Sequence, residues 1–188
     1  KEVSDGDFLG AFHSKRIPML RKKLFAEFLG TAVLVATVVG SGIMATNLST
    51  DVGIQLLINT VATVFTLYIA ITLLGPISGA HFNPAVSLVQ VVRREMNAVE
   101  LLSFISAQIA GAISGAIIAN VMFDLEAIQI STNERVSTGT LVGEVIATAG
   151  LITVIFVLVA RSQDKLIPLA VAAWIGSAYF FTSSTSFA

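Results

Sequence analysis

The stretch GPISGAHFNPAVSLVQVVRR, residues 75–94, places several helix-breaking signals between long apolar runs. Gly75 and Pro76 are expected to end one membrane helix, because proline removes a backbone donor and glycine weakens a helix interior. The small residues 78–80 then allow the chain to turn back tightly. The stretch therefore predicts a backbone break inside the membrane.

A second helix start follows within the same stretch. Asn83 stands where an N-cap belongs, and Pro84 takes the first helical position. At about 1.5 Å per residue, a helix over residues 84–92 reaches only about halfway through a bilayer. These residues predict a re-entrant half-helix that begins at mid-membrane. A plain kink at Pro84, the alternative, leaves the Gly-Pro and Ser-Gly-Ala signals unexplained.

The composition identifies an integral membrane protein. Of the residues, 55% are hydrophobic and 12% are charged, with a mean hydropathy of +0.86, whereas soluble domains carry roughly 25% charged residues. The net charge of -1, with no Lys/Arg stripe interleaved with aromatics, argues against a nucleic-acid partner. The chain has no cysteine and therefore no disulfide or thiolate metal site, and no cofactor or metal is predicted.

Five apolar runs are long enough to cross a bilayer, which takes about 20 helical residues. They are residues 24–45, 52–74, 99–123, 139–160 and 166–187. Lysine and arginine collect on the cytoplasmic side of membrane proteins. If the half-helix returns to the face it entered from, one side receives Lys15, Arg16, Arg21, Lys22, Lys23, Arg93, Arg94, Arg161 and Lys165. The opposite loops carry Asp51 and the segment 124–136, so a cytoplasmic N-terminus is predicted.

The starts of the first and fourth spans resemble each other. AEFLGTAVLVATVV from Ala26 aligns with GEVIATAGLITVIF from Gly143, which pairs Glu27 with Glu144. Three spans separate the two starts, so the copies enter the membrane from opposite faces, as in an inverted repeat. The alternative is that two membrane helices look alike by composition alone.

Glu27 and Glu144 are the carboxylates placed within the spans. A charge there costs at least about 2.5 kcal/mol and needs a polar partner. Broken backbone supplies unpaired N–H groups that a buried carboxylate can accept. We therefore expect each glutamate to brace a re-entrant loop, with a proton-relay acid in a pump as the rival interpretation. Gln108 is expected to bond to loop backbone and to share this bracing role.

The half-helix also predicts a pore or binding site. Its N-terminal N–H groups direct positive charge at the bilayer centre, which favours solute oxygens and opposes cations. Irregular backbone at this depth survives where it lines a cavity or is buried in protein. The candidate lining residues are Gly79, Ala80, His81, Asn83, Pro84 and Ala85. His81 could also act as a pH-sensitive gate or serve as a structural histidine in a crowded loop.

Four segments resemble the aquaporin and glycerol-facilitator family, also called the major intrinsic protein family. SGAHFNPAVS, residues 78–87, is similar to the first Asn-Pro-Ala box of that family. AEFLGT from Ala26, AQIAGAISGA from Ala107 and GEVIAT from Gly143 lie in the order and helix positions that the family shows. The resemblance covers the chain from about residue 21 and extends to the bacterial branch associated with arsenic resistance.

The resemblance implies an all-α, aquaporin-like inverted-repeat bundle, usually a homotetramer, that passes neutral solutes passively and without a cofactor. Residues 1–20 would form a cytoplasmic segment and residues 21–188 the channel domain. The first repeat would cover about 21–123, and an incomplete second repeat about 139–188. Five spans and one half-helix are present, while the second half-helix and sixth span are missing. We therefore expect a fragment that continues into a second Asn-Pro-Ala box and does not conduct selectively by itself.

By the family's spacing, the selectivity filter would involve Thr63, Ser177 and Ser186. These small polar residues resemble those of members that pass glycerol, urea or metalloid hydroxides such as arsenite, besides water. Their alternative role is ordinary helix packing. A water-selective aquaporin is the alternative function, followed by an inverted-repeat secondary transporter and a non-conducting scaffold. An enzyme is not expected, because no nucleophile–base pair, metal cluster or phosphate loop is present. The expected location is the cell membrane, most simply a bacterial inner membrane.

Overall fold

The computed structural model describes residues 5–132 and 134–183, and their side chains from Met19 onward. Within these ranges the regular structure is helical. The helices are α1 (Asp5–Leu48), α2 (Val52–Ser78), α3 (Pro84–Val92), α4 (Ala98–Met122), α5 (Thr138–Ala160), the 3-10 turn η1 (Asp164–Leu166) and α6 (Ile167–Phe181). The prediction of an all-α protein with a membrane-spanning helical bundle is confirmed.

Four of the described helices are long and apolar enough to cross a membrane: the Met19–Leu48 part of α1, then α2, α4 and α5. They correspond to the first four predicted spans, and the third ends one residue earlier than predicted, at Met122. The fifth predicted span, residues 166–187, corresponds to α6, whose 15 residues follow the 3-10 turn. The end of that predicted span lies outside the described residues.

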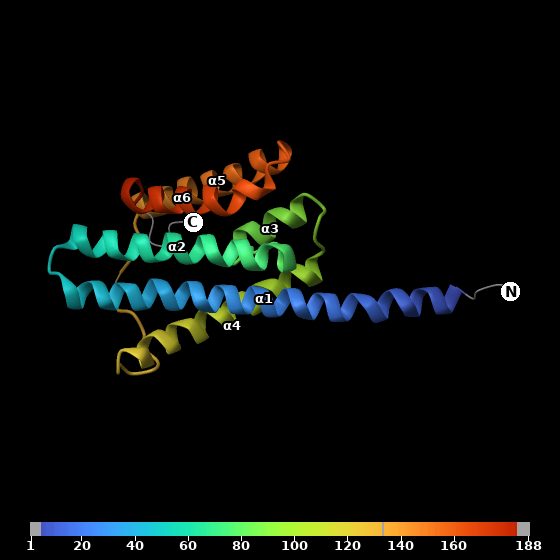
Figure 1. Ribbon diagram of the computed structural model, residues 1–188, viewed down its shortest axis with the longest axis horizontal. Coiled ribbons are helices and arrows are strands. Elements are labelled where there is room, and N and C mark those ends of the chain that lie inside the picture. Colours follow the sequence, from blue (N-terminus) through green and yellow to red (C-terminus); the bar gives the residue numbers. More distant parts are fainter. Residues whose placement is uncertain (1–4, 133, 184–188) are drawn as a thin grey trace.

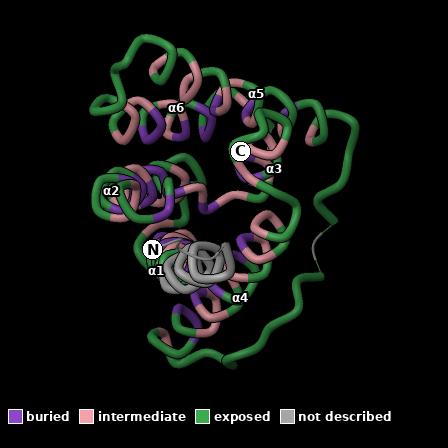
Figure 2. The backbone as a smooth tube through the Cα atoms, turned by 90° about the vertical axis from the view of Figure 1, so that its right-hand side faces the viewer, coloured by how far each residue is buried: buried purple, intermediate pink, exposed green. Residues whose placement is uncertain are grey.

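The helices are arranged around α2 (Figure 1). On one side α2 packs against α1, which also packs against α4, and on the other side it packs against α6, which packs against α5. The half-helix α3 packs on α4. Seen along the bundle in Figure 2, α3 lies between α4 and α5, and the segment that connects it to α2 passes through the interior.

The half-helix has the bounds that the sequence predicts, Pro84–Val92. The prediction that Gly75 and Pro76 end the preceding helix was wrong, because α2 continues through Pro76 to Ser78. A proline this close to a helix end removes only one late backbone bond, so the last turn survives. The Gly79 N–H closes this turn on the Gly75 carbonyl at 2.9 Å. The break therefore begins at Gly79.

Helices α1 and α4 pack backbone against backbone. A Cβ atom added at Gly111 would lie 2.4 Å from the Phe28 carbonyl oxygen, and one at Gly115 would lie 2.2 Å from that of Ala32. Any side chain at either position would force the helices apart. Small residues allow this close approach, which drives helix association in lipid.

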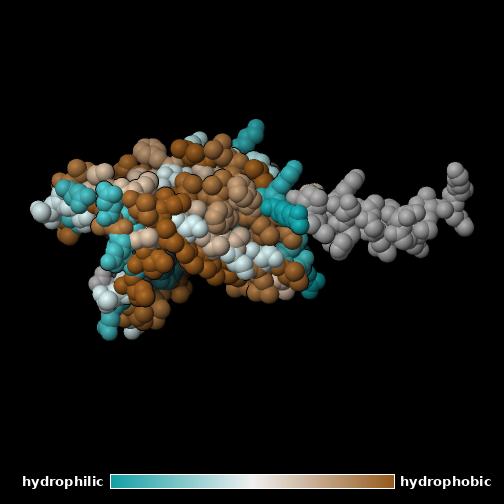
Figure 3. Space-filling model, turned by 90° about the horizontal axis from the view of Figure 1, so that it is seen from below, coloured by the Kyte–Doolittle hydropathy of each residue, from teal (hydrophilic) through white to brown (hydrophobic). Residues whose placement is uncertain are grey.

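The outer surface of the bundle suits a lipid environment. Large apolar side chains are exposed on every membrane-length helix, for example Phe25, Phe65, Ile113 and Val145. Figure 3 shows a largely hydrophobic middle, with hydrophilic residues towards the ends. The chain is a multi-pass membrane protein.

Candidate functional site

The connection between α2 and α3 has an unusual backbone. Gly79, Ala80 and Phe82 have positive φ angles of 94°, 49° and 46°. Residues other than glycine rarely adopt this left-handed region, at a cost of about 1–3 kcal/mol each. Such strain persists only where the surrounding structure over-determines the backbone. The contacts that hold this segment come mainly from α1.

Glu27 of α1 accepts four hydrogen bonds, three from residues 78–82 and one from Gln108 of α4. Its Oε1 accepts from the Ser78 hydroxyl at 2.6 Å and from the His81 N–H at 3.0 Å, while its Oε2 accepts from the Phe82 N–H at 2.8 Å and from Gln108 Nε2 at 2.9 Å. The residue is 0% exposed. Buried carboxylates need such donors, and each charge-assisted bond is stronger than a neutral one. The bracing role assigned to Glu27 stays a prediction, which these contacts support.

Ser87 connects the half-helix to the same network. Its hydroxyl lies 2.9 Å from His81 Nδ1 and 3.2 Å from the Asn83 carbonyl oxygen, and it accepts from Gln108 Nε2 at 3.1 Å. Gln108 was expected to bond to loop backbone. That expectation was wrong in detail, because its amide nitrogen instead bonds the side chains of Glu27 and Ser87. The carboxylate is the stronger acceptor, and it carries the loop bonds itself.

The opening of α3 is capped as predicted. The Asn83 side-chain oxygen accepts from the Ala85 N–H at 2.7 Å and from the Val86 N–H at 3.4 Å. Pro84 occupies the first turn, where a missing N–H costs nothing. The N-terminal end of α3, with its partial positive charge, thus lies beside the connecting segment.

Phe82 locks the segment against α1 at a position where α1 has no side chain. A Cβ atom added at Gly30 would lie 2.0 Å from Phe82 Cε1. The phenyl ring therefore occupies the space that any other residue at position 30 would fill. Phe82 is itself buried.

His81 faces α4, where its ring centroid lies 5.2 Å from that of Phe104. It also lines a cavity of about 170 Å³ that is bounded by α1, α3 and α4 and includes Lys23, Gln90 and Glu100. The backbone N–H of His81 thus bonds Glu27, whereas its ring contacts Ser87 and Phe104. The lining and gating roles of His81 stay predictions.

The structure does not bring the described filter residues together: Thr63 is buried, whereas Ser177 is exposed. Thr63 of α2 is buried, and its hydroxyl donates to the Asn59 carbonyl at 2.8 Å and lies 3.0 Å from the Tyr179 hydroxyl of α6. Ser177 is exposed, with its hydroxyl donated to the Ala173 carbonyl at 3.0 Å. Ser186 lies outside the described residues. The filter assignment stays a prediction.

Glu144 lies near the start of α5 and is half-buried. Its bracing role also stays a prediction. Among residues 19–132 and 134–183, no group of three or more His, Cys, Asp or Glu side chains could hold a metal ion.

Sequence reasoning did not single out Ser87, Phe82 or Tyr179, and it assigned Ser78 only the role of a small residue in the turn. Two of these carried a usable signal. Ser87 lies four residues after Asn83 in an apolar half-helix, so both occupy one face. Ser78 directly precedes the left-handed Gly79, where a hydroxyl can satisfy turn backbone, as its bond from the Ala80 N–H at 3.0 Å shows.

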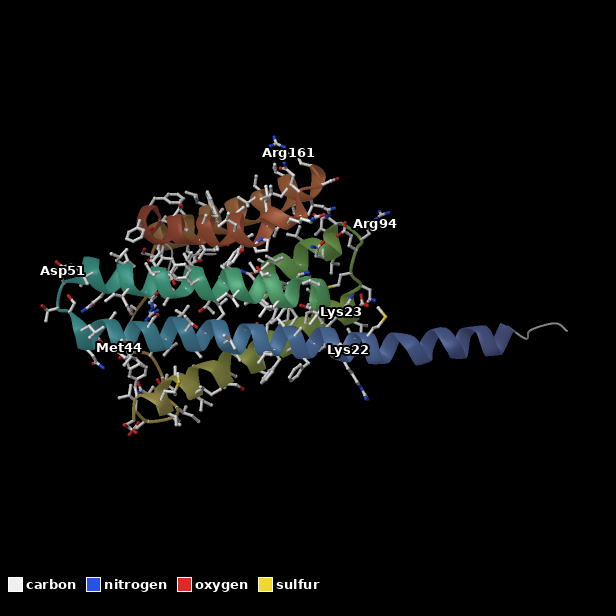
Figure 4. All side chains as sticks on the ribbon, viewed as in Figure 1. Lys22, Lys23, Met44, Asp51, Arg94 and Arg161 are labelled. Atoms are coloured by element: carbon white, nitrogen blue, oxygen red, sulfur yellow. The ribbon has the colours of Figure 1, made fainter. Side chains whose placement is uncertain are left out.

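Several basic residues gather at one end of the bundle. In Figure 4, Lys22, Lys23, Arg94 and Arg161 lie at one end, and Asp51 lies at the other. The re-entrant course of α3 produces this separation, because it returns residues 93–94 to the end from which the segment entered.

Comparisons with known proteins agree with this architecture. The family model described as major intrinsic protein matches residues 14–186. The chain is 43% identical over 169 residues to the aquaglyceroporin AqpS of Rhizobium meliloti, covering 90% of this chain and 72% of that protein. It is 41% identical over 100 residues to aquaporin Z of Brucella melitensis, covering 53% of this chain and 43% of that protein.

A solved structure is also similar. The X-ray structure of the aquaglyceroporin from Plasmodium falciparum matches with a TM-score of 0.67 and 26% sequence identity. The match covers 89% of this chain and 75% of that one.

Proposed function

Because the chain belongs to the major intrinsic protein family, we propose that it forms a passive transmembrane channel of the aquaglyceroporin type for small uncharged solutes. The observation that carries this proposal is the Glu27-braced segment between α2 and α3. The solutes are glycerol, urea and metalloid hydroxides such as arsenite, together with water. The protein is a channel and not an enzyme.

The segment between α2 and α3 offers hydrogen-bond acceptors to a solute. The N–H groups of Ala80, His81 and Phe82 are bound to Ser78 and Glu27. Within the described part of the chain, the carbonyl oxygens of Gly79, Ala80 and His81 have no hydrogen-bond donor. Backbone acceptors at membrane depth need water or a solute. A row of such acceptors can replace the hydration of a hydroxylated solute.

The start of α3 contributes a partial positive charge. Its partial positive charge opposes cations, and the Asn83 and Ala85 region brings that charge to the end of the acceptor row. A neutral solute satisfies both parts at once, since its oxygens accept while its hydroxyls donate. This arrangement supports the proposed lining role of Gly79, Ala80, His81, Asn83, Pro84 and Ala85.

Orientation and assembly complete the proposal. The end of the bundle with Lys22, Lys23, Arg94 and Arg161 faces the cytoplasm, as the positive-inside rule requires. The resemblance to aquaporins supports a homotetramer, and the similarity to proteins of Rhizobium and Brucella supports a bacterial inner membrane. Residues 1–20 form a cytoplasmic segment, and residues 21–188 belong to the channel domain.

Stopped-flow light scattering on proteoliposomes tests the function. Protein expressed from the complete reading frame should give fast shrinkage in sucrose and fast re-swelling in glycerol, relative to empty liposomes. The glycerol flux should rise linearly with the gradient and be independent of sodium and proton gradients. Fast shrinkage without glycerol-driven re-swelling would instead indicate a water-selective aquaporin. Saturable, ion-coupled uptake would indicate a secondary transporter, and either result would contradict the proposal.

A further inference from the structure

Helices α2 and α6 meet through an unusual buried contact. Thr63 and Tyr179 are 3% and 4% exposed, and their hydroxyl oxygens lie 3.0 Å apart. One turn before Tyr179, a Cβ atom added at Gly176 would lie 2.8 Å from Val64 Cγ2. Two polar side chains thus meet next to a close contact of the two helices. A buried polar pair of this kind needs complete hydrogen bonding.

The donor in this pair follows from the other bond of Thr63. The threonine hydroxyl has one hydrogen, which it donates to the Asn59 carbonyl at 2.8 Å. The Tyr179 hydroxyl must then donate to Thr63 Oγ1. The threonine hydroxyl is therefore engaged as donor and as acceptor, and its polar group is withdrawn from any solute that passes α2.

The position of Ser177 supports the same conclusion. Ser177 precedes Tyr179 by two residues, which places the two side chains about 200° apart around α6. Tyr179 is the α6 residue that contacts Thr63, whereas Ser177 is exposed and bonds its own helix at Ala173. On α6, the immediate neighbour of Thr63 is therefore a tyrosine ring and not a small serine.

We propose that Tyr179 is a specificity-determining positioning residue of the channel, which acts through Thr63. Its ring closes the α6 side of the path at the level of Thr63, and its hydroxyl occupies the oxygen that Thr63 would otherwise offer to a polyol. This inference rests on the proposed function and on the predicted place of Thr63 in the filter. It makes the throat narrower and less polar than three small hydroxyl residues would.

The test compares permeability ratios in proteoliposomes made from the complete reading frame. The readout is the ratio of glycerol permeability to water permeability, each corrected for empty liposomes. Tyr179→Phe removes the hydrogen bond between the two hydroxyls, which frees the Thr63 oxygen and releases the ring. The ratio of glycerol to water permeability should therefore rise about fivefold, the factor that corresponds to one neutral hydrogen bond. Tyr179→Leu also removes the ring and should raise the ratio further. A purely structural role would lower both permeabilities in proportion and leave the ratio unchanged.

Two further variants complete the design. Tyr68→Phe is the matched control, because Tyr68 is the other tyrosine of the chain and is 42% exposed on α2; its ratio should equal that of the wild type. In a Thr63→Val background, Tyr179→Phe should no longer raise the ratio, because the Thr63 oxygen that it frees is absent.

Each outcome has a defined meaning. Wild-type protein with no glycerol flux above empty liposomes would refute the proposed function. A conducting wild type with the same ratio in Tyr179→Phe and Tyr179→Leu would refute the role of Tyr179 alone. If Tyr179→Leu fails to fold, Tyr179→Phe decides, since it keeps the ring and loses only the oxygen.

Discussion

The two copies of the internal repeat differ in the burial of their aligned glutamates. Glu27 in the first copy is fully buried and accepts four hydrogen bonds, all from the α2–α3 connection and α4. Glu144 in the second copy lies near the start of α5 and is half-buried. The two aligned residues thus differ in how far they are buried. The donors around Glu27 come mainly from the broken backbone between α2 and α3.

The residue three positions later also differs between the copies. Gly30 faces the Phe82 ring at a distance that excludes a Cβ atom, whereas the aligned Ala147 is fully buried and its carbonyl accepts from Trp174 Nε1 at 2.9 Å. In the first copy a side chain from the loop fills the space beside Gly30, and in the second a side chain from α6 bonds the backbone of Ala147. The two helices therefore share a sequence pattern, but the residue at each aligned position depends on the side chains that pack against it.

The largest effect is expected at Glu27. Glu27→Ala removes the acceptor of the Ser78 hydroxyl and of two backbone N–H groups, together with one of the two acceptors of the Gln108 amide, at a cost of about 3–5 kcal/mol in the free energy of unfolding. Unfolding with SDS in mixed micelles measures this cost, and glycerol flux should be lost with it. A cost below about 1 kcal/mol would contradict the bracing role. Glu144→Ala sharpens the comparison, because an equal cost would extend the bracing to both copies.

The next effect is expected at the contact of α1 and α4. Gly115→Ala drives a methyl group into the Ala32 backbone carbonyl, which cannot move without shifting the helix. We expect a loss of about 3 kcal/mol, the upper end for overpacking. Gly40→Ala is the matched control in α1, because its added Cβ atom would lie 3.4 Å from the Phe123 ring, a tolerable contact. Equal unfolding free energies for both variants would show that α1 and α4 separate easily.

Gly30→Ala probes the loop side of the comparison and should cost about 2 kcal/mol. The clash is with the Phe82 ring, so the double variant Gly30→Ala/Phe82→Ala should lose less stability than the sum of the two single variants in a double-mutant cycle. Ala147→Gly, at the aligned position, should cost only about 1 kcal/mol through backbone entropy and lost burial. Additive effects of Gly30→Ala and Phe82→Ala would mean that the ring does not fill the space beside Gly30.

The smallest effect is expected where α3 meets the second copy. The Arg93 guanidinium lies 4.5 Å from the centroid of the Phe156 ring of α5 and bonds Glu95 at 2.7 Å. Glu95→Gln should cost less than about 1 kcal/mol, because both partners are exposed and solvent screens the pair. Phe156→Leu should cost about the same through the cation–π contact. The salt dependence of unfolding distinguishes them, since only the ion pair weakens in high salt.

Much of the fold could be predicted because membrane helices are identified by length and hydropathy. The half-helix was predictable as well, since Asn83 and Pro84 give a clear start and residues 84–92 are too few to span a bilayer. The end of α2 was harder, because Pro76 so near the helix end costs only one bond and the left-handed Gly79 decides the break.

The site was predictable where a buried charge demands partners, as at Glu27. It was less predictable where the role of a glycine or a hydroxyl depends on a residue that is distant in the sequence. Gly30 has meaning only once Phe82 is placed, and the Thr63–Tyr179 pair joins residues 116 positions apart. No local spacing indicates such a contact, because it depends on how α2 and α6 cross.

The most direct test of the central claim uses the absence of cysteine in the sequence. A single Ala85→Cys variant, made in the complete reading frame, places a thiol at the start of α3, and Ile69→Cys places one on an exposed face of α2. Glycerol flux is then measured before and after treatment with a small, membrane-permeant thiol reagent. The account predicts that the reagent blocks flux through Ala85→Cys and leaves Ile69→Cys unaffected. Unblocked flux through a fully labelled Ala85→Cys protein would show that solutes do not pass the half-helix and would contradict the account.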